Sequence, residues 1–443
     1  MSKKSSGSGV FGSSGLLTIT QLARMVSLFL VTVLIARSEG PAALGQFSLA
    51  IAFVTLLQLG STGGLAGAGV LSLLRQNDGT DSAAVSISAV RTTLIPPIFV
   101  VGFVVFLAVA SDSSYALFVA TLFVGYAIGA YDLPELILTA RGRFRALAMV
   151  RLILVVLIAS PKLFLAWNGS LAFVLVLQGL EAALWQMALL PITGGLLKVF
   201  TRGALAFREV RKQLRDKRLL WVSGLAAAAS TRADLLMVGW LLGASAAGVY
   251  SAATRPIEAI GVIGIAITTV VFNPLAAASS DSTIYAERAH NASRTVLMWG
   301  AVLTVAGCVV GPPAVAILYG PEFGEAKILI ALYSVTILLV FQRQLVSKIL
   351  LIERAYGYSL VSNTACLFIV VGGAALTAHR WGLTGVIVST IVAYAVSSFG
   401  ILLLTRKGRS ILALSVMGVR RTAKSDTHTS RLLRERAEHA ETT

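Results

Sequence analysis

Long apolar stretches, separated by short polar segments, recur along the whole chain. A helix that crosses about 30 Å of hydrocarbon needs roughly 20 apolar residues. The stretches do not alternate polar with apolar positions, as the strands of an outer-membrane barrel would. The pattern therefore predicts an all-α integral membrane protein with twelve transmembrane helices. The predicted spans are 14–36, 44–70, 92–110, 115–138, 147–166, 171–191, 219–242, 247–274, 295–318, 327–348, 358–378 and 383–404.

Composition supports lipid as the solvent. Hydrophobic residues make up 56% of the chain and charged residues only 13%, against about 25% charged in a typical soluble protein. The mean hydropathy is +0.83. The two cysteines, Cys308 and Cys366, both lie inside apolar stretches. We interpret them as small hydrophobic residues, because neither a disulfide framework nor a metal-binding spacing is present.

Basic residues are distributed unevenly between the two sides of the predicted spans. The net charge is +17, from 37 Lys and Arg against 20 Asp and Glu. With the N-terminus in the cytoplasm, 29 basic residues lie on the cytoplasmic side, and four lie outside: Arg37, Lys162, Lys327 and Arg380. This asymmetry predicts an even number of spans with both termini in the cytoplasm. It also explains the positive charge by attraction to membrane lipids, so that no nucleic-acid partner is needed.

The same pattern divides the chain into two halves of six spans each. A linker between them interleaves Phe200, Leu205 and Phe207 with eight basic residues, which is typical of an interfacial helix on anionic lipid. We interpret the tail as a short interfacial piece followed by a loose helix. The predicted parts are a six-helix bundle (1–197), the basic amphipathic linker (198–218), a second six-helix bundle (219–405) and a basic cytoplasmic tail (406–443).

An internal repeat relates the two halves. The segment GPAALGQFSLA begins at Gly40, and GASAAGVYSAA begins at Gly243, 203 residues later. At the same offset Gly45 corresponds to Gly248. Each motif joins the first two spans of its half, so the halves have the same orientation. Such a parallel repeat predicts a binding site between the halves.

Two segments resemble a known family. LLTITQLARMVSLFLVTVLIARSEGPAALGQFSLAIAFVTLLQLG, and RADLLMVGWLLGASAAGVYSAATRPIEAI in the second half, are similar to bacterial polysaccharide flippases of the Wzx type. The likeness in residues covers mainly 16–75 and 219–275. These flippases belong to the MOP superfamily, together with the multidrug and toxin extrusion (MATE) exporters and the lipid II flippases.

The resemblance implies a MATE-like fold, with two six-helix bundles around a central cavity that opens alternately to each side. It also implies a bacterial inner-membrane location and a polyprenyl-pyrophosphate-linked oligosaccharide as the substrate. A polysaccharide polymerase or glycosyltransferases are the further partners that it suggests.

Three arginines inside spans are the candidates for substrate binding. Arg24 and Arg232 lie in the first span of each half, at depths that we expect to match, and Arg255 lies in the eighth span. Ionisable groups in a span usually face a wet cavity or pair with one another. A guanidinium offers a fixed fork of donors that suits a pyrophosphate, and the resemblance implies cavity arginines of this kind. The alternative is that they pair with acids such as Glu258 and serve only to hold helices together.

Two acids inside spans are candidates for ion coupling. The chain has no Gly-Lys-Ser/Thr phosphate loop, so ATP hydrolysis is not expected. Uphill transport would then require an ion gradient or the membrane potential. Glu181 in the sixth span and Asp234 in the seventh are the possible proton carriers. No catalytic or metal-binding spacing is present, so we expect neither an enzyme nor a cofactor.

Other polar residues in spans have a structural interpretation. Asp132 and Glu135 are expected to pair with the basic run RGRFR that directly follows their span. For Arg343, in the tenth span, an ion pair and a functional role both stay open. Gly60, Gly64, Pro97 and Pro274 are candidates for gating or bending. For the two glycines, close helix packing is the favoured interpretation.

These observations favour a flippase that moves polyprenyl-pyrophosphate-linked oligosaccharide from the inner to the outer leaflet by alternating access. An ion-coupled MATE-type exporter of small molecules is the first alternative, and it would need binding acids that are not already paired. A non-transporting scaffold of a polysaccharide assembly complex is the second, and it would tolerate the loss of the charges inside the spans.

Overall fold

All regular structure in the described part of the chain is helical. The computed structural model describes residues 7–62, 80–109, 116–193, 215, 218–278, 282–353 and 355–417. Most of the predicted linker 198–218, and the tail beyond residue 417, lie outside these ranges. The expectations for those two segments therefore stay predictions.

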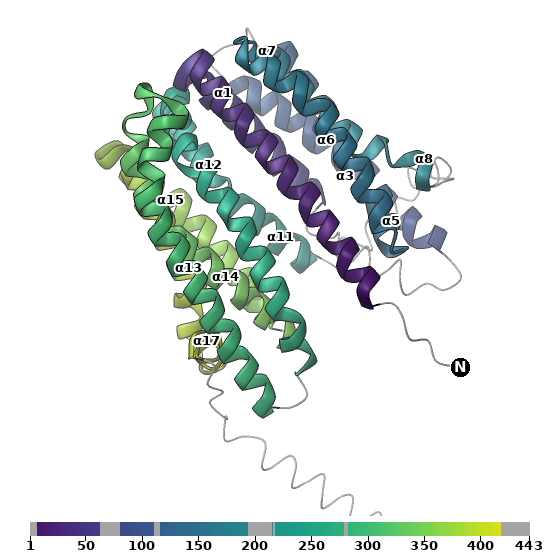
Figure 1. The fold of residues 1–443 in the computed structure, drawn as a ribbon, viewed down its shortest axis with the longest axis vertical. Helices are drawn as coiled ribbons and strands as arrows, with labels where there is room; N and C mark the ends of the chain where they lie inside the picture. The colour runs from purple at the N-terminus through teal and green to yellow at the C-terminus, as the bar shows by residue number, and fades with distance from the viewer. Residues whose placement is uncertain are drawn as a thin grey trace, which may run out of the picture.

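The described helices lie side by side in a bundle (Figure 1). In the first half of the chain they are α1 (Gly7–Thr62), α3 (Thr80–Val109), α4 (Ala116–Gly129), α5 (Leu133–Ala140), α6 (Phe144–Trp167), α7 (Leu171–Met187) and α8 (Leu190–Thr193). In the second half they are α11 (Arg218–Ser230), α12 (Ala233–Ala277), α13 (Ser282–Tyr319), α14 (Ala326–Ile352), α15 (Tyr356–Ala395), α16 (Ile401–Leu403) and α17 (Arg406–Met417). A 3-10 turn (Pro321–Phe323) precedes α14, and a π turn (Val396–Gly400) follows α15.

Nine helical segments among the described residues are long and apolar enough to cross a membrane. Three of the long helices, α1, α12 and α15, contain a non-helical glycine, at Gly40, Gly243 and Gly382 respectively. A straight helix of the 56 residues of α1 would extend about 84 Å, well beyond the hydrocarbon core. Each kink lies between two predicted spans. The count of twelve spans and their division into two six-helix bundles stay predictions.

The kinks at Gly40 and Gly243 have the same conformation. Their φ and ψ angles are 79° and −170° at Gly40, and 89° and 176° at Gly243. Side chains other than that of glycine are strained at such positive φ values. The repeated sequence motif therefore folds in the same way in both halves, which supports an internal duplication.

The two copies of the motif pack directly against each other. A Cβ atom added to Gly45 would lie 1.7 Å from the carbonyl oxygen of Ala244, and one added to Gly248 would lie 1.9 Å from that of Pro41. Only glycine permits this approach of the α1 and α12 backbones, as in other close helix crossings within membranes. The glycines of the repeat thus form the crossing between the two halves.

Polar contacts reinforce the same end of the molecule. Arg37, just before the kink in α1, donates its Nε to the carbonyl oxygen of Leu318 at 2.7 Å, at the C-terminal end of α13. Glu39 accepts a hydrogen bond of 2.9 Å from the backbone N–H of Leu171 at the start of α7. From this end, α1 and α12 diverge toward the end that carries the N-terminus (Figure 1).

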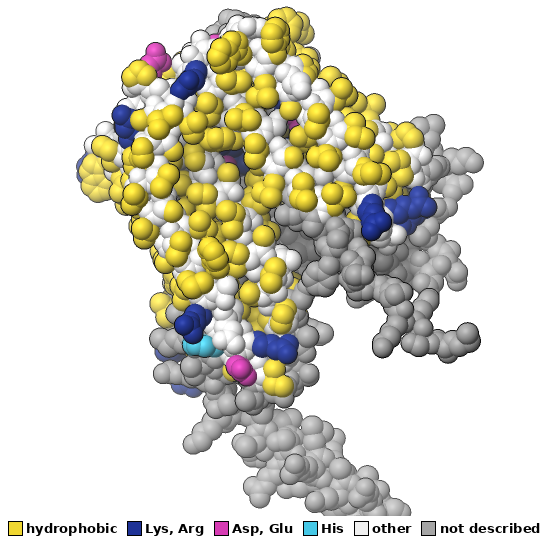
Figure 2. All heavy atoms as spheres, in the orientation of Figure 1, with side chains coloured by type: hydrophobic (Ala, Val, Ile, Leu, Met, Phe, Trp, Pro, Cys, Tyr) yellow, Lys and Arg dark blue, Asp and Glu magenta, His cyan; other side chains and the backbone are white. Residues whose placement is uncertain are grey.

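The described surface is apolar over most of its height. Figure 2 shows hydrophobic side chains across this face, while most of the Lys and Arg side chains lie near the two ends of the molecule. A few charged atoms are visible at depth between the two halves. This distribution suits a protein whose sides contact lipid and whose ends contact water.

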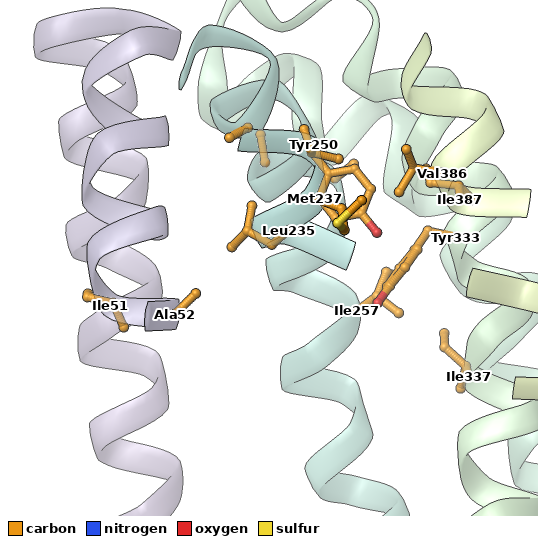
Figure 3. Packing of buried hydrophobic residues seen from close by; sticks show 14 of the residues in the cluster. Ile51, Ala52, Leu235, Met237, Tyr250, Ile257, Tyr333, Ile337, Val386 and Ile387 are labelled. Carbon is orange, nitrogen blue, oxygen red and sulfur yellow. The ribbon is translucent and has the colours of Figure 1, made fainter. Parts of the chain in front are cut away.

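Aromatic and aliphatic side chains join the helices of the second half. Tyr250 of α12 and Tyr333 of α14 approach edge to face, with ring centroids 6.2 Å apart. Val386 and Ile387 of α15 belong to the same buried cluster (Figure 3). Ile411 of α17 joins this core as well, so the first part of the tail is a helix that packs on the bundle. Its interfacial position stays a prediction.

Two predicted spans are interrupted. Span 115–138 consists of α4 and α5, with Asp132 directly before α5. Span 219–242 consists of α11 and the first part of α12, with Arg232 directly before α12. Discontinuous helices of this kind commonly form the binding sites of transporters, because they expose backbone groups at membrane depth.

Three basic residues expected at the membrane surface are buried instead. Lys162 was expected outside, and Arg91 and Arg151 in cytoplasmic segments, but their exposed fractions are 2%, 1% and 8%. Each lies within a helix and pairs with an acid from another helix. Hydropathy cannot reveal such pairs, because the partners are distant in sequence. If these three residues are no longer counted as loop residues, the cytoplasmic side still carries an excess of basic residues.

The predicted orientation can be tested by labelling single cysteines. In a background without Cys308 and Cys366, we expect Asn168→Cys to react with an impermeant maleimide added outside cells. Arg409→Cys should react only in inverted membrane vesicles. Both wild-type residues are exposed, and they follow α6 and begin α17 respectively. Labelling of both from the same side would contradict the predicted topology.

Candidate functional site

A buried glutamate in the first half is shared by two cations. Glu181 of α7 accepts a hydrogen bond from the Nζ of Lys162 in α6. Its other carboxylate oxygen lies 3.5 Å from the Nε of Arg24 in α1. Gln178, one turn before Glu181, accepts a further hydrogen bond of 3.0 Å from Lys162. We call Arg24, Lys162 and Glu181 the first-half triad.

The α7 residues at the first-half triad lie on one face of this helix. Gln178, Glu181 and Trp185 are spaced by three and four residues, so they project from the same side of the helix. The guanidiniums of Arg24 and of Arg151 in α6 each lie 4.7 Å from the centre of the Trp185 ring. Such contacts between a cation and an aromatic face stabilise a charge where water is scarce.

The second half contains an equivalent arrangement around Glu258 of α12. The Nη1 of Arg232 lies 3.1 and 3.2 Å from the two oxygens of this carboxylate. The Nη1 of Arg255 lies 3.3 Å from one of them, because residues three apart meet on one helix face. We call Arg232, Arg255 and Glu258 the second-half triad.

Members of both triads are partly accessible. The side chains of Arg24 and Glu258 are 32% and 33% exposed, and that of Arg232 is 22% exposed. Glu181 and Lys162, in contrast, are almost completely buried. Arg24 is therefore the accessible cation of this triad, while Lys162 holds the acid in the interior.

Asp234 lies near the second triad but is held differently. Its carboxylate accepts hydrogen bonds of 2.8 Å from the hydroxyl of Tyr250 and of 2.8 Å from the N–H of Leu235. Within the described ranges, no cation forms an ion pair with it. Of the two acids proposed for ion coupling, only Asp234 is thus without a basic partner in the described structure.

The acids of the fourth span pair with residues other than those expected. Asp132 binds Arg91 of α3 through two hydrogen bonds, of 2.9 and 3.1 Å, and Glu135 pairs with Arg151 of α6. The prediction that the following run RGRFR holds both acids was wrong. That run occupies the turn after α5 and the start of α6, whereas α3 and α6 pack beside the acids.

Arg343 of α14 is compensated by neutral groups. Its guanidinium donates a hydrogen bond of 2.7 Å to the side-chain oxygen of Asn363 and lies 5.5 Å from the centre of the Tyr394 ring. No carboxylate among the described residues forms an ion pair with it. The buried Cys366 lies 3.5 Å from its Nη1.

Arg24 and Arg232 are not equivalent positions of the repeat. Arg24 lies sixteen residues before Gly40, and Arg232 lies eleven residues before Gly243. Five residues correspond to roughly 7.5 Å along a helix. At the repeat offset, Arg232 corresponds to Phe29. The expectation of matching depths was therefore wrong, and the two triads are alike in composition but not in position.

The proposed bending positions lie in continuous helix where they are described. Gly60 lies in α1, and its carbonyl oxygen accepts a hydrogen bond of 3.1 Å from the indole of Trp221. Pro97 lies inside α3, and Pro274 lies in the last turn of α12. Gly64 lies outside the described residues. A role for these four positions in bending stays a prediction.

Sequence reasoning missed Lys162, Arg151 and Trp185 as members of the site. A signal for Lys162 was present, because a buried acid such as Glu181 requires a counter-charge, and Lys162 is a basic residue inside a predicted span. No comparable signal pointed to Trp185, since an aromatic residue in an apolar stretch looks like any other core residue.

Comparison with known families gives a match over residues 34–328, to the family described as polysaccharide biosynthesis protein. The chain belongs to this family. Comparison with curated protein sequences gives no match.

Solved structures of MOP-superfamily transporters share the fold. An inward-facing multidrug resistance MATE transporter is 17% identical, with a TM-score of 0.67 over 90% of this chain and 96% of that one. The lipid II flippase MurJ, in an inward closed conformation, is 14% identical, with a TM-score of 0.68 over 92% of this chain and 90% of that one. A MOP-superfamily transporter from Pyrococcus furiosus is 16% identical, with a TM-score of 0.57 over 91% of this chain and 96% of that one. The MATE-like fold implied by the sequence resemblance is confirmed at this level.

The arrangement of the first-half triad predicts a strong dependence on Lys162. Lys162→Met leaves Glu181 buried with only the partly exposed Arg24, which should destabilise the protein by about 3 kcal/mol. We expect a lower melting temperature of the purified protein in detergent. The double variant Lys162→Met with Glu181→Gln should recover much of this loss, because no buried charge is left unpaired. An unchanged melting temperature of Lys162→Met would contradict the pairing.

Proposed function

We propose that this protein flips polyprenyl-pyrophosphate-linked oligosaccharide from the cytoplasmic to the outer leaflet of a bacterial inner membrane, by alternating access and with both termini in the cytoplasm. The observation that carries the proposal is the composition of the two triads. Each has two cations and one glutamate. The first triad keeps one positive charge after pairing, and the second keeps one while the nearby Asp234 is protonated. Together they offer two positive charges to a pyrophosphate that carries about two negative charges.

The partial exposure of the triads supports this role. Arg24 and Arg232 retain accessible surface, and their fixed donor forks suit phosphate oxygens. A bound pyrophosphate would compete with Glu181 and Glu258 for these donors. Because Lys162 also holds Glu181, Arg24 can turn to the substrate without leaving a buried acid unpaired. Arg232 can do the same in the second half, since the more deeply buried Arg255 also holds Glu258.

The same pairing argues against a cation-binding exporter of the MATE type. Such a site needs acids that are free to meet the substrate, whereas Glu181 and Glu258 each contact two cations. Asp234 lacks a described basic partner, but it is buried and accepts two hydrogen bonds. Membership of a polysaccharide biosynthesis family agrees with the oligosaccharide substrate.

Replacement of the accessible arginines tests this proposal. Arg24→Ala and Arg232→Ala should reduce transport of lipid-linked oligosaccharide in proteoliposomes at least about 100-fold, because a doubly charged head near the bilayer centre loses a compensating charge. The Lys variants should recover part of the activity, since they keep the charge but lose the fork. Arg294→Ala, at an exposed position of α13, is the matched control.

The abundance of each variant separates the competing functions. Near-normal abundance with lost transport supports the substrate role. Full transport by both Ala variants at normal abundance would refute the anionic-substrate site and favour the small-molecule exporter or the scaffold. If abundance falls instead, and charge-swapped pairs restore both abundance and transport, the arginines hold helices together and do not bind substrate.

We propose Asp234 as the group that couples transport to a proton gradient. Asp234→Asn should make transport independent of an imposed pH gradient, because an amide keeps the size of the side chain but cannot carry a proton. Glu181→Gln, the other acid considered, should lower stability more than coupling, since it removes the partner of Lys162. Wild-type transport that is indifferent to the pH gradient would exclude proton coupling altogether.

A further inference from the structure

A second site lies on the seam between α1 and α12, and no residue of the triads lines it. It is a cavity of about 620 Å³, and residues of both halves of the chain line it. The segment of α1 after Gly40 and helix α12 supply its opposite walls, through residues such as Leu49, Phe53 and Leu236. Val371 of α15 closes a further side.

The lining of this seam cavity is almost entirely apolar. Gln46 is the one residue with an amide, hydroxyl or charged side chain among those that line it. Phe53, Phe106 and Trp240 contribute aromatic faces, and the remaining residues are aliphatic or glycine. A site with so few polar groups cannot compensate a phosphate or hold a sugar, so its chemistry selects a hydrocarbon chain.

The seam cavity begins beside the second-half triad. Ala229 and Ala233, which line it, precede and follow Arg232 in the sequence. Its other end reaches Ala244, beyond the kink of α12. Between the start of α12 at Ala233 and the kink at Gly243 the cavity follows ten residues of helix, which corresponds to roughly 15 Å, about half of the hydrocarbon thickness of about 30 Å.

Contacts between the halves close the seam at both ends. At one end Gly45 and Gly248 bring the backbones of α1 and α12 together. At the other end Trp221 donates a hydrogen bond to Gly60. Between them the side chain of Trp240, which is 68% exposed, marks an opening toward the bilayer. A chain can therefore enter sideways from lipid but cannot pass along the seam into water.

We propose that the seam cavity holds the isoprenoid chain of the carrier lipid while the pyrophosphate lies at the arginines. This inference rests on the proposed function. The position of Ala233, which directly follows Arg232 and lines the cavity, favours the carrier over a bulk phospholipid, because a head held at Arg232 leaves its own chain close to the cavity. The aromatic walls suit the double bonds and methyl branches of an isoprenoid. The site thus makes the protein selective for the chain as well as for the charged head.

Photolabelling of the wild-type protein tests the occupant. The full-length protein in lipid nanodiscs is irradiated with a long-chain polyprenyl diphosphate that carries a diazirine in its chain, and the labelled residues are identified by mass spectrometry. We expect label at cavity residues such as Leu236 and Val371, and competition by unlabelled polyprenyl diphosphate. Equal labelling of these residues by a phosphatidylglycerol with a diazirine in its acyl chain would show an ordinary membrane lipid there and overturn the proposal.

A filling variant provides the second measurement. Val371→Trp should weaken binding of the long-chain polyprenyl diphosphate roughly fivefold and leave geranyl diphosphate unaffected. We expect only a roughly fivefold change because lipid is as apolar as the cavity, so only packing contacts favour binding of the chain in the cavity. Val361→Trp is the matched control: it lies on the same helix and is 54% exposed, but it does not line the cavity.

The two hypotheses fail in different ways. If binding of both diphosphates depends on Arg24 and Arg232 while Val371→Trp has no effect, the chain site is wrong and the proposed function stands. If binding of neither depends on the arginines, the proposed function itself is wrong.

Discussion

Compensation of charge in a medium that lacks water is the constraint on which the rest of this structure depends. A charged side chain at bilayer depth is costly unless a partner neutralises it. In the described structure Glu181 and Glu135 meet this requirement by reaching across helices, from α7 to α1 and α6, and from α5 to α6. Asp234 instead accepts hydrogen bonds from neutral donors. The ion pairs thereby fix which helices are neighbours, a task that apolar packing alone performs weakly in lipid.

The excess of cations over acids turns this structural requirement into a possible function. A pair of one acid and one cation, such as Arg91 with Asp132, is satisfied and has nothing left to offer. A triad of two cations and one acid still has one cation whose charge is not neutralised. Its second cation can exchange the acid for an external anion at little cost, because the first cation keeps the acid neutralised. The partly exposed Arg24 and the buried Lys162 divide these two roles clearly.

The crossing of the two halves serves a different purpose. The backbones approach closely at Gly45 and Gly248, and this contact needs no charge. It lies at the end where Arg37 and Glu39 also join neighbouring helices. Away from it α1 and α12 diverge, and the halves meet again where Trp221 donates a hydrogen bond to Gly60.

The sequence alone determined the helical membrane fold, the repeat and its turning glycines, and the family. These features depend on local composition: long apolar runs, and glycines at fixed positions. The sequence also identified Arg24, Arg232 and Arg255 as charged residues inside spans, because a charge inside an apolar run is conspicuous.

Only the tertiary structure decided which charges meet. Lys162 and Arg151 looked like surface residues, and Asp132 and Glu135 were assigned to the wrong bases. Partners such as Lys162 and Glu181 come from different helices, and helix neighbours are set by packing rather than by chain order. The breaks before Asp132 and Arg232, and the seam cavity between the halves, were likewise hidden in the sequence. They arise where distant segments approach, and no local pattern records that approach.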